Sequence, residues 1–142
     1  AKTMLKEAKA LKNTRLDEIE SVIKILELVE QNLIGAYAAQ FAFMYELSKL
    51  GVLKLSRQEM IDIITNDEEK LKLEILEWLM AFSHMAYAPM SDEEFRVYND
   101  FSKSDLGILL NKALFSVYNE MAKDQSQSLA NILGEFMKSE EL

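Results

Sequence analysis

The chain has 142 residues, of which 16 are basic and 24 acidic, so its formal net charge is −8. It lacks Cys, which excludes disulfides, thiol catalysis and cysteine-bound zinc or iron–sulfur centres, and a single His leaves little scope for imidazole catalysis. Four Gly and one Pro are too few for the tight turns of a β-sandwich or barrel. The acidic balance argues against binding to nucleic-acid phosphates, and the length suits one domain of about 150 residues.

The charge is spread unevenly along the chain. Residues 1–15 hold five basic residues against Glu7 alone, which makes this stretch +4 and the remainder −12. The basic residues are Lys2, Lys6, Lys9, Lys12 and Arg15. Such a stretch is typical of a solvated helix face. Alternatively, its lysines make a weak contact with an anionic membrane surface or an acidic partner. The longest nearly uncharged stretch, residues 31–45, is shorter than the ~20 residues that span a bilayer, so no transmembrane segment is predicted.

Apolar residues recur at helical spacing along almost the whole chain. They predict a short helix over residues 4–11 and a second helix that Thr14 and Asp17 start as a capping pair. The same spacing predicts one continuous helix from Arg15 to Leu50, with a kink expected, if anywhere, at Gly35.

The middle of that long helix is apolar on nearly all sides and rich in small residues. We therefore expect residues 33–45 at the buried centre of a helix bundle. Gly51 is placed to end the helix as a left-handed cap. Ser56 and Glu59 form a capping-box pattern that begins a short helix reaching Ile64.

Two further capping patterns divide the second half of the chain. Thr65 with Glu68 predicts the start of a helix that Pro89 ends, and Ser91 with Glu94 predicts the start of a short one. The residues expected in the core of the first are Leu71, Ile75, Trp78, Leu79 and Phe82. Those expected on the apolar face of the second are Phe95, Tyr98 and Phe101.

Ser104 is predicted to cap a final long helix. Its apolar periodicity resumes in phase after the polar residues 123–128, which predicts one helix rather than two domains. The predicted core stripe is Ile108, Leu110, Leu114, Val117, Met121, Leu129, Ile132, Leu133 and Phe136. The sequence thus predicts an all-α fold, a bundle of about six helices including two long ones. We expect a single helical domain over 1–142, with N-terminal helices in 1–66 and a second region in 67–142.

No set of residues converges on catalysis. A di-iron bundle needs Glu-x-x-His pairs, but Ala81 stands three residues before His84. Ser83 and His84 are adjacent on a helix and cannot pair directly. Paired carboxylates such as Glu27 and Glu30 are typical of a solvated face. We therefore predict no enzyme, no catalytic residues and no cofactor.

One cluster combines thioether and imidazole side chains. Met80 and His84 share a helix face, with Met85 and Met90 nearby, and such ligands suit cuprous ion. His84, Met80 and Met85 are therefore metal candidates, although Met also fills gaps in helical cores. Aromatic residues at helical spacing leave a second alternative, an apolar ligand site between helices.

The second half of the chain also carries a short motif. Residues 90–95 read Met-Ser-Asp-Glu-Glu-Phe, an acidic helix start, and residues 101–107 read Phe-Ser-Lys-Ser-Asp-Leu-Gly. From about Leu76 to Phe136 the chain resembles a bacterial exported-protein family known as domain of unknown function number 2,059. Phe101, Ser104 and Gly107 match the family's signature, whereas Ser102 and Asp105 stand where it has Tyr and Pro.

The resemblance implies an exported, periplasmic bacterial protein without established enzymatic activity. Physically, Phe101 is expected to anchor the short helix, Ser104 to cap the long one, and Gly107 to let the two pack closely. We therefore expect a non-catalytic helical protein that binds a protein partner or forms a homodimer. The alternative is binding of an apolar small molecule or of copper between helices.

Overall fold

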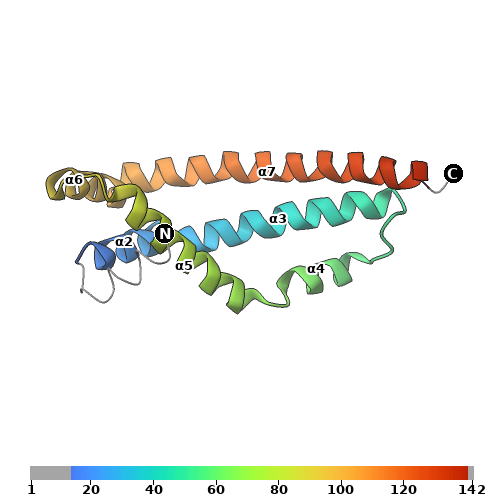
Figure 1. Cartoon of the computed structure of the whole chain (residues 1–142), viewed down its shortest axis with the longest axis horizontal. Coiled ribbons are helices and arrows are strands. Elements are labelled where there is room, and N and C mark those ends of the chain that lie inside the picture. The colour runs from blue at the N-terminus through green and yellow to red at the C-terminus, as the bar shows by residue number, and fades with distance from the viewer. Residues whose placement is uncertain (1–13, 141–142) are drawn as a thin grey trace. The chain divides into compact units, whose positions relative to one another are not determined.

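The computed structural model describes residues 14–140, and within them the fold is all-α, as predicted (Figure 1). The described stretch holds six helices: α2 (Thr14–Ile25), α3 (Leu28–Lys49), α4 (Arg57–Thr65), α5 (Glu68–Tyr87), α6 (Asp92–Lys103) and α7 (Asp105–Glu140). The two long ones are α3, with 22 residues, and α7, with 36. The predicted helix over residues 4–11, with its lysines, lies outside the described residues.

The helices group into two compact units, each built from two separate stretches of chain. The first unit contains the residues up to 32 and residues 70–114, and the second contains residues 33–69 and those from 115 onward. The first unit therefore holds α2, most of α5, and α6. The second unit holds most of α3, with α4 and the larger part of α7.

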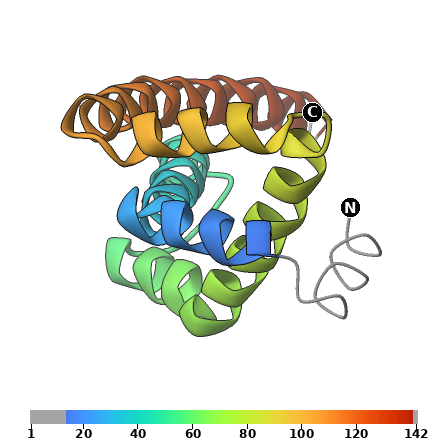
Figure 2. The ribbon, with the colours of Figure 1, turned by 90° about the vertical axis from the view of Figure 1, so that its left-hand side faces the viewer.

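The core of the first unit forms where α2, α5 and α6 meet (Figure 2, with α2 in blue and α6 in yellow). Apolar residues three or four apart on α2 supply one side of it, and a short run of α5 supplies the other. Phe95 of α6 is 2% exposed and completes it. The buried cluster comprises Leu16, Ile19, Ile23, Leu79, Met80, Ala81 and Phe95.

The predicted continuous helix from Arg15 to Leu50 is wrong, because the chain breaks at Leu26 and Glu27. Glu27 adopts a left-handed conformation with φ of 52°, which is uncommon for a residue other than Gly. The break lets Leu26 stay buried while Leu28 packs against the core of the first unit. No Gly or Pro marks this point, so the sequence carried no local signal for it.

Gly35, where a kink was considered, is helical and serves close packing instead. A Cβ atom there would collide with the side chain of Asn119 on α7. Gly134 of α7 meets Leu50 in the same way. The first contact joins α3 to α7 in the second unit, and the second joins α7 to the residue that follows α3. Met60 and Ile64 of α4 are also buried in this unit.

The expectation that residues 33–45 form a fully buried centre is only partly met. Leu33, Gly35 and Ala42 are buried, but Ile34 and Tyr45 are exposed. In the second unit, α3 packs against α7 and α4. These two helices leave part of the surface of α3 exposed, although its sequence is apolar on nearly all sides.

The capping predictions are mostly confirmed. Ser56 and Ser91 each form a complete capping box with the Glu three residues on, and Gly51 has φ of +77°. The predicted cap at Thr65 is wrong, because Thr65 is the last residue of α4 and its hydroxyl donates to the Ile61 carbonyl. A Thr near a helix end can bond forward as a cap or backward to the preceding turn, and here it does the latter.

The predicted burial of Trp78 and Phe82 is also wrong. Both lie on the outer face of α5, where Trp78 is 53% exposed, and their rings stack with centroids 5.2 Å apart. The helix turns Leu79 and Met80 inward instead. Tyr98 and Phe101 of α6, expected in the core with Phe95, are likewise exposed. In each case the apolar stripe is wider than the surface that covers it.

Candidate functional site

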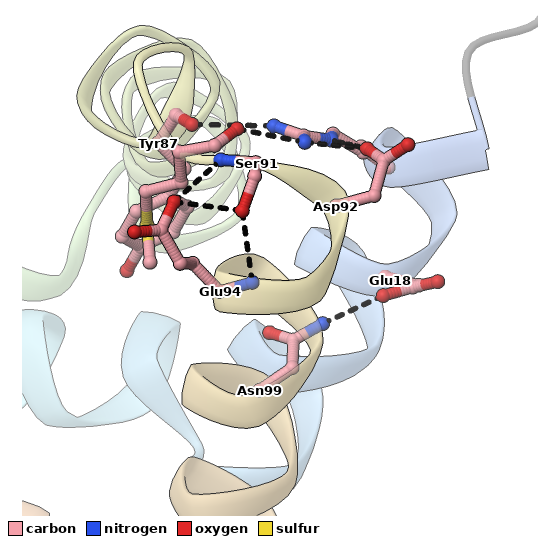
Figure 3. A network of polar contacts seen from close by, with 8 residues as sticks. Glu18, Tyr87, Ser91, Asp92, Glu94 and Asn99 are labelled. Carbon is pink, nitrogen blue, oxygen red and sulfur yellow. Dashed lines mark hydrogen bonds and ion pairs between the residues drawn. The ribbon is translucent and has the colours of Figure 1, made fainter.

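A polar network in the first unit joins α2 to the turn between α5 and α6 (Figure 3). The Arg15 guanidinium donates to Asp92 Oδ1 from Nε at 3.0 Å and from Nη2 at 2.5 Å. It also donates to the carbonyls of Tyr87 and Met90. Its Cζ lies 5.0 Å from the centroid of the Phe95 ring. Because Arg15 is engaged on all sides, this network holds elements together rather than offering a free charge.

A further hydrogen bond joins α2 to α6. Asn99 of α6 is 2% exposed, and its Nδ2 donates to Glu18 Oε2 of α2 at 2.9 Å (Figure 3). A buried amide is stable only when its hydrogen bonds are satisfied, so this pair specifies how α2 and α6 face each other. The sequence did not predict this pair, because Asn99 belongs to no motif.

Glu94 belongs to the same turn. Hydrogen bonds from the Ser91 backbone amide and side chain hold the pKa of Glu94 below its ordinary value of 4.5. The contribution of Glu94 to stability is therefore fully present above about pH 4.5 and declines as the pH falls through its lowered pKa.

We expect Glu94→Gln to reduce the acid sensitivity of folding. Glutamine still accepts from the Ser91 amide but does not titrate in this range. Urea unfolding at neutral pH should show Glu94→Gln less stable than the wild type, and this gap should close as the pH falls through the lowered pKa of Glu94, because protonated Glu94 has lost its charge-assisted bonds. Glu93→Gln, an exposed neighbour without these bonds, is the control. A gap that stays constant as the pH is lowered from neutral into the acid range would contradict this role of the carboxylate.

The metal candidates are not brought together. His84 lines a cavity of about 490 Å³ in the first unit, which Met90 and Tyr87 also line. Met80 instead packs in the core of that unit, and Met85 is exposed. Residues 14–140 contain no group of three or more His, Asp or Glu placed to hold a metal ion. Copper binding stays a prediction with only His84 and Met90 at one cavity.

Tyr87, which lines this cavity, has a pKa above its ordinary value. Burial raises its pKa, and the hydroxyl of Tyr98 at 3.4 Å raises it further. Tyr87 therefore stays protonated at neutral pH and does not act as a base.

The three residues of the family motif lie at the junction of α6 and α7, in the first unit. The Ser104 hydroxyl accepts from the Gly107 amide at 3.1 Å and donates to the Phe101 carbonyl at 2.6 Å. A Cβ atom on Gly107 would collide with the carbonyl oxygen of Phe101. The Phe101 ring, however, is exposed and lines a shallow cavity of about 150 Å³ rather than the core.

The largest departure from expectation is the apolar stripe of α7, which faces outward. The helix is continuous through residues 123–128, as predicted. Within the second unit, its large exposed apolar residues are 38% to 67% exposed: Val117, Tyr118, Met121, Leu129, Ile132, Leu133, Phe136 and Met137. The helix instead turns small and polar residues inward, including Asn119, Ala130 and Gly134. Helical spacing correctly identified the stripe but assigned it to the wrong side.

Six of these eight exposed residues are arranged symmetrically about Gln125. They form three pairs at four, seven and eight residues on either side of it: Met121 and Leu129, Tyr118 and Ile132, Val117 and Leu133. In the sequence, Leu114 and Phe136 continue the symmetry at eleven residues. Spacings of four, seven and eight keep side chains on one helix face. The apolar face therefore has the same pattern when the helix is read in either direction.

An apolar cleft of about 330 Å³ lies between α3 and α4 in the second unit. Its α3 wall is formed by Tyr37, Ala38 and Phe41, and its α4 wall by Arg57, Ile61, Ile64 and Thr65. Arg57 extends over the Phe41 ring, with Cζ 5.7 Å from the ring centroid. Arg57 belongs to no sequence motif and was not predicted as a site residue, although its spacing of four and seven residues from Ile61 and Ile64 places it on the same helix face.

Comparison of the chain with protein-family models, with characterised proteins and with solved structures yields no match. The resemblance of residues 76–136 to the exported family therefore stays a prediction. Across the described helices, none has both the length and the apolar character needed to cross a bilayer.

Proposed function

We propose that the protein is a non-catalytic helical protein that binds a second copy of itself through the outward apolar face of α7. The symmetry of that face about Gln125 is the observation that supports this function most directly. A two-fold dimer uses the same patch on both copies, so the patch must be complementary to itself. Two antiparallel α7 helices centred on Gln125 meet this requirement.

Antiparallel pairing places the apolar residues of one copy opposite apolar residues of the other along the face. Val117 contacts the partner's Leu133, Tyr118 contacts the partner's Ile132, and Met121 contacts the partner's Leu129. The two Gln125 amides meet at the centre, where each can donate to and accept from the other. In a parallel pair, each residue would instead face the same residue of the partner, so none of these three contacts would form.

The exposed area is consistent with a modest affinity. Six side chains per copy, each roughly half exposed, gain about 1 kcal/mol apiece when buried. Twelve in a pair therefore gain about 12 kcal/mol, of the same order as the ~4–15 kcal/mol that association costs in lost motion. We expect dimerisation in the micromolar to millimolar range. Exposed apolar patches of this kind on a soluble helix commonly mark interaction surfaces.

The absence of cysteine from the chain makes the pairing directly testable. We expect Gln125→Cys to form a disulfide with itself under mild oxidation, because both copies bring this position to the two-fold axis. Leu133→Cys should not crosslink alone, since antiparallel pairing holds its two copies about 24 Å apart along the helix. A mixture of Val117→Cys and Leu133→Cys should form a mixed disulfide. Non-reducing gel electrophoresis with mass spectrometry measures all three.

Sedimentation equilibrium of the cysteine-free chain, from about 10 µM to about 1 mM, provides the independent measurement. Ile132→Lys should shift the equilibrium to monomer by about 100-fold or more, because each dimer would bury two unpaired charges. Ser116→Lys, an exposed change on another face of α7, should leave it unchanged. A strict monomer at all concentrations would falsify self-association. Self-crosslinking of Leu133→Cys as efficient as that of Gln125→Cys would contradict the antiparallel arrangement alone.

A further inference from the structure

The cleft between α3 and α4 is independent of the α7 face and has the features of a small-molecule site. Its walls are apolar, since Ala38 and Phe41 oppose Ile61 and Ile64 across it. Ile61 remains exposed at the opening. Ligand sites typically combine such apolar walls with a few placed polar groups that fix orientation.

The polar residues of the α4 wall, Arg57 and Thr65, lie at its two ends. Because α4 begins at Arg57 and ends at Thr65, eight residues or about 12 Å separate these two lining residues along the helix. Arg57 makes no ion pair with any carboxylate among residues 14–140, so its guanidinium donors are available to another group. The Phe41 ring holds it beside the cleft at 5.7 Å.

The opposite end is already occupied by bonds within the protein. The Thr65 hydroxyl donates to the Ile61 carbonyl at 3.0 Å, and the Tyr37 hydroxyl donates to Glu68 Oε2 at 3.3 Å. Glu68 would also repel a second negative charge at that end. The cleft therefore has one end that attracts an anion and one that does not.

We propose that this cleft binds an amphiphile with one apolar chain and one carboxylate, such as a fatty acid. The chain lies between α3 and α4, and the carboxylate pairs with Arg57 at the start of α4. An arginine fork accepts a carboxylate through two parallel hydrogen bonds, which suits this headgroup better than an alcohol or an amine.

Dodecanoate is the probe, titrated into the full chain by calorimetry below the concentration at which it forms micelles. We expect saturable binding of one molecule per chain. Arg57→Gln should weaken it by about tenfold or more, because a hydrogen bond to a charged group contributes about 1.5–3 kcal/mol. Dodecanol, which has the same chain without the charge, should bind the wild type about as weakly as dodecanoate binds Arg57→Gln.

Two further variants serve as controls. Arg96→Gln removes an exposed arginine of α6 that lines no part of the cleft, and it should bind dodecanoate like the wild type. Ala38→Leu should weaken both ligands by filling the cleft while circular dichroism shows unchanged helicity. No saturable binding, equal affinity for dodecanol and dodecanoate, or an equal effect of Arg96→Gln and Arg57→Gln would each overturn the assignment. None of these outcomes depends on whether α7 self-associates.

Discussion

Phe95→Ala is expected to lower the free energy of unfolding by about 3–5 kcal/mol, the usual loss when a buried aromatic is truncated. The Phe95 ring is 2% exposed, lies beneath the Arg15 guanidinium and packs against Tyr87 at a centroid distance of 5.7 Å. Its removal leaves a cavity where three helices meet and takes away the ring on which Arg15 rests. Urea denaturation followed by circular dichroism measures the change.

Val97→Ala provides the comparison, since Val97 lies two residues away on the same helix but is 65% exposed. A surface change of this kind is expected within about 0.5 kcal/mol of the wild type. If Phe95→Ala and Val97→Ala lost similar amounts of stability, Phe95 would not be the centre of the first unit's core.

Gly107→Ala is expected to destabilise the protein by about 1–3 kcal/mol or more, as overpacking usually does. The added Cβ would collide with the carbonyl oxygen of Phe101 and approach Ser102 Cα at 2.9 Å. Both are backbone atoms at the tight α6–α7 junction, so the strain cannot be relieved by a side-chain rotation. The change would also disturb the bond from the Gly107 amide to Ser104.

Gly134→Ala is the matched test on the same helix. Its added Cβ would meet only the Cδ1 end of the Leu50 side chain, which can rotate away, and alanine gains about 1 kcal/mol in helix propensity over glycine. We expect little net change. A large loss at Gly134 with none at Gly107 would show that α3–α7 packing, rather than the junction, is the tighter constraint. Thermal and urea unfolding of both variants decide this.

The capping boxes at Ser56 and Ser91 and the left-handed Gly51 were predictable because each depends on residues within one helical turn. The continuity of α7 was predictable for a similar reason, since its periodicity resumed in phase after residues 123–128. The break at Glu27 was not. The left-handed conformation there costs local energy, which the packing of Leu26 and Leu28 on either side and the contacts of Asn111 and Lys112 with the break help to offset.

The candidate sites divide in the same way. Helical spacing located the apolar stripe of α7, but Arg57 was not among the predicted site residues, although it lies four and seven residues from Ile61 and Ile64. The spacing could not reveal that Phe41 of another helix lies under Arg57, or that the copper candidates Met80 and Met85 do not line the cavity that His84 lines. Such relations join residues from different helices, so they depend on how the helices meet.

The sequence by itself determined the all-α class, the ends of most helices and which faces are apolar, because these follow from interactions between residues a few positions apart. Only the tertiary structure decided which apolar faces are covered. Burial depends on whether another helix lies opposite, and the choice between Ala130 and Leu129 as the inward residue of α7 turns on how closely α3 approaches. That choice left the symmetric face around Gln125 exposed, and from this exposure the proposed function follows.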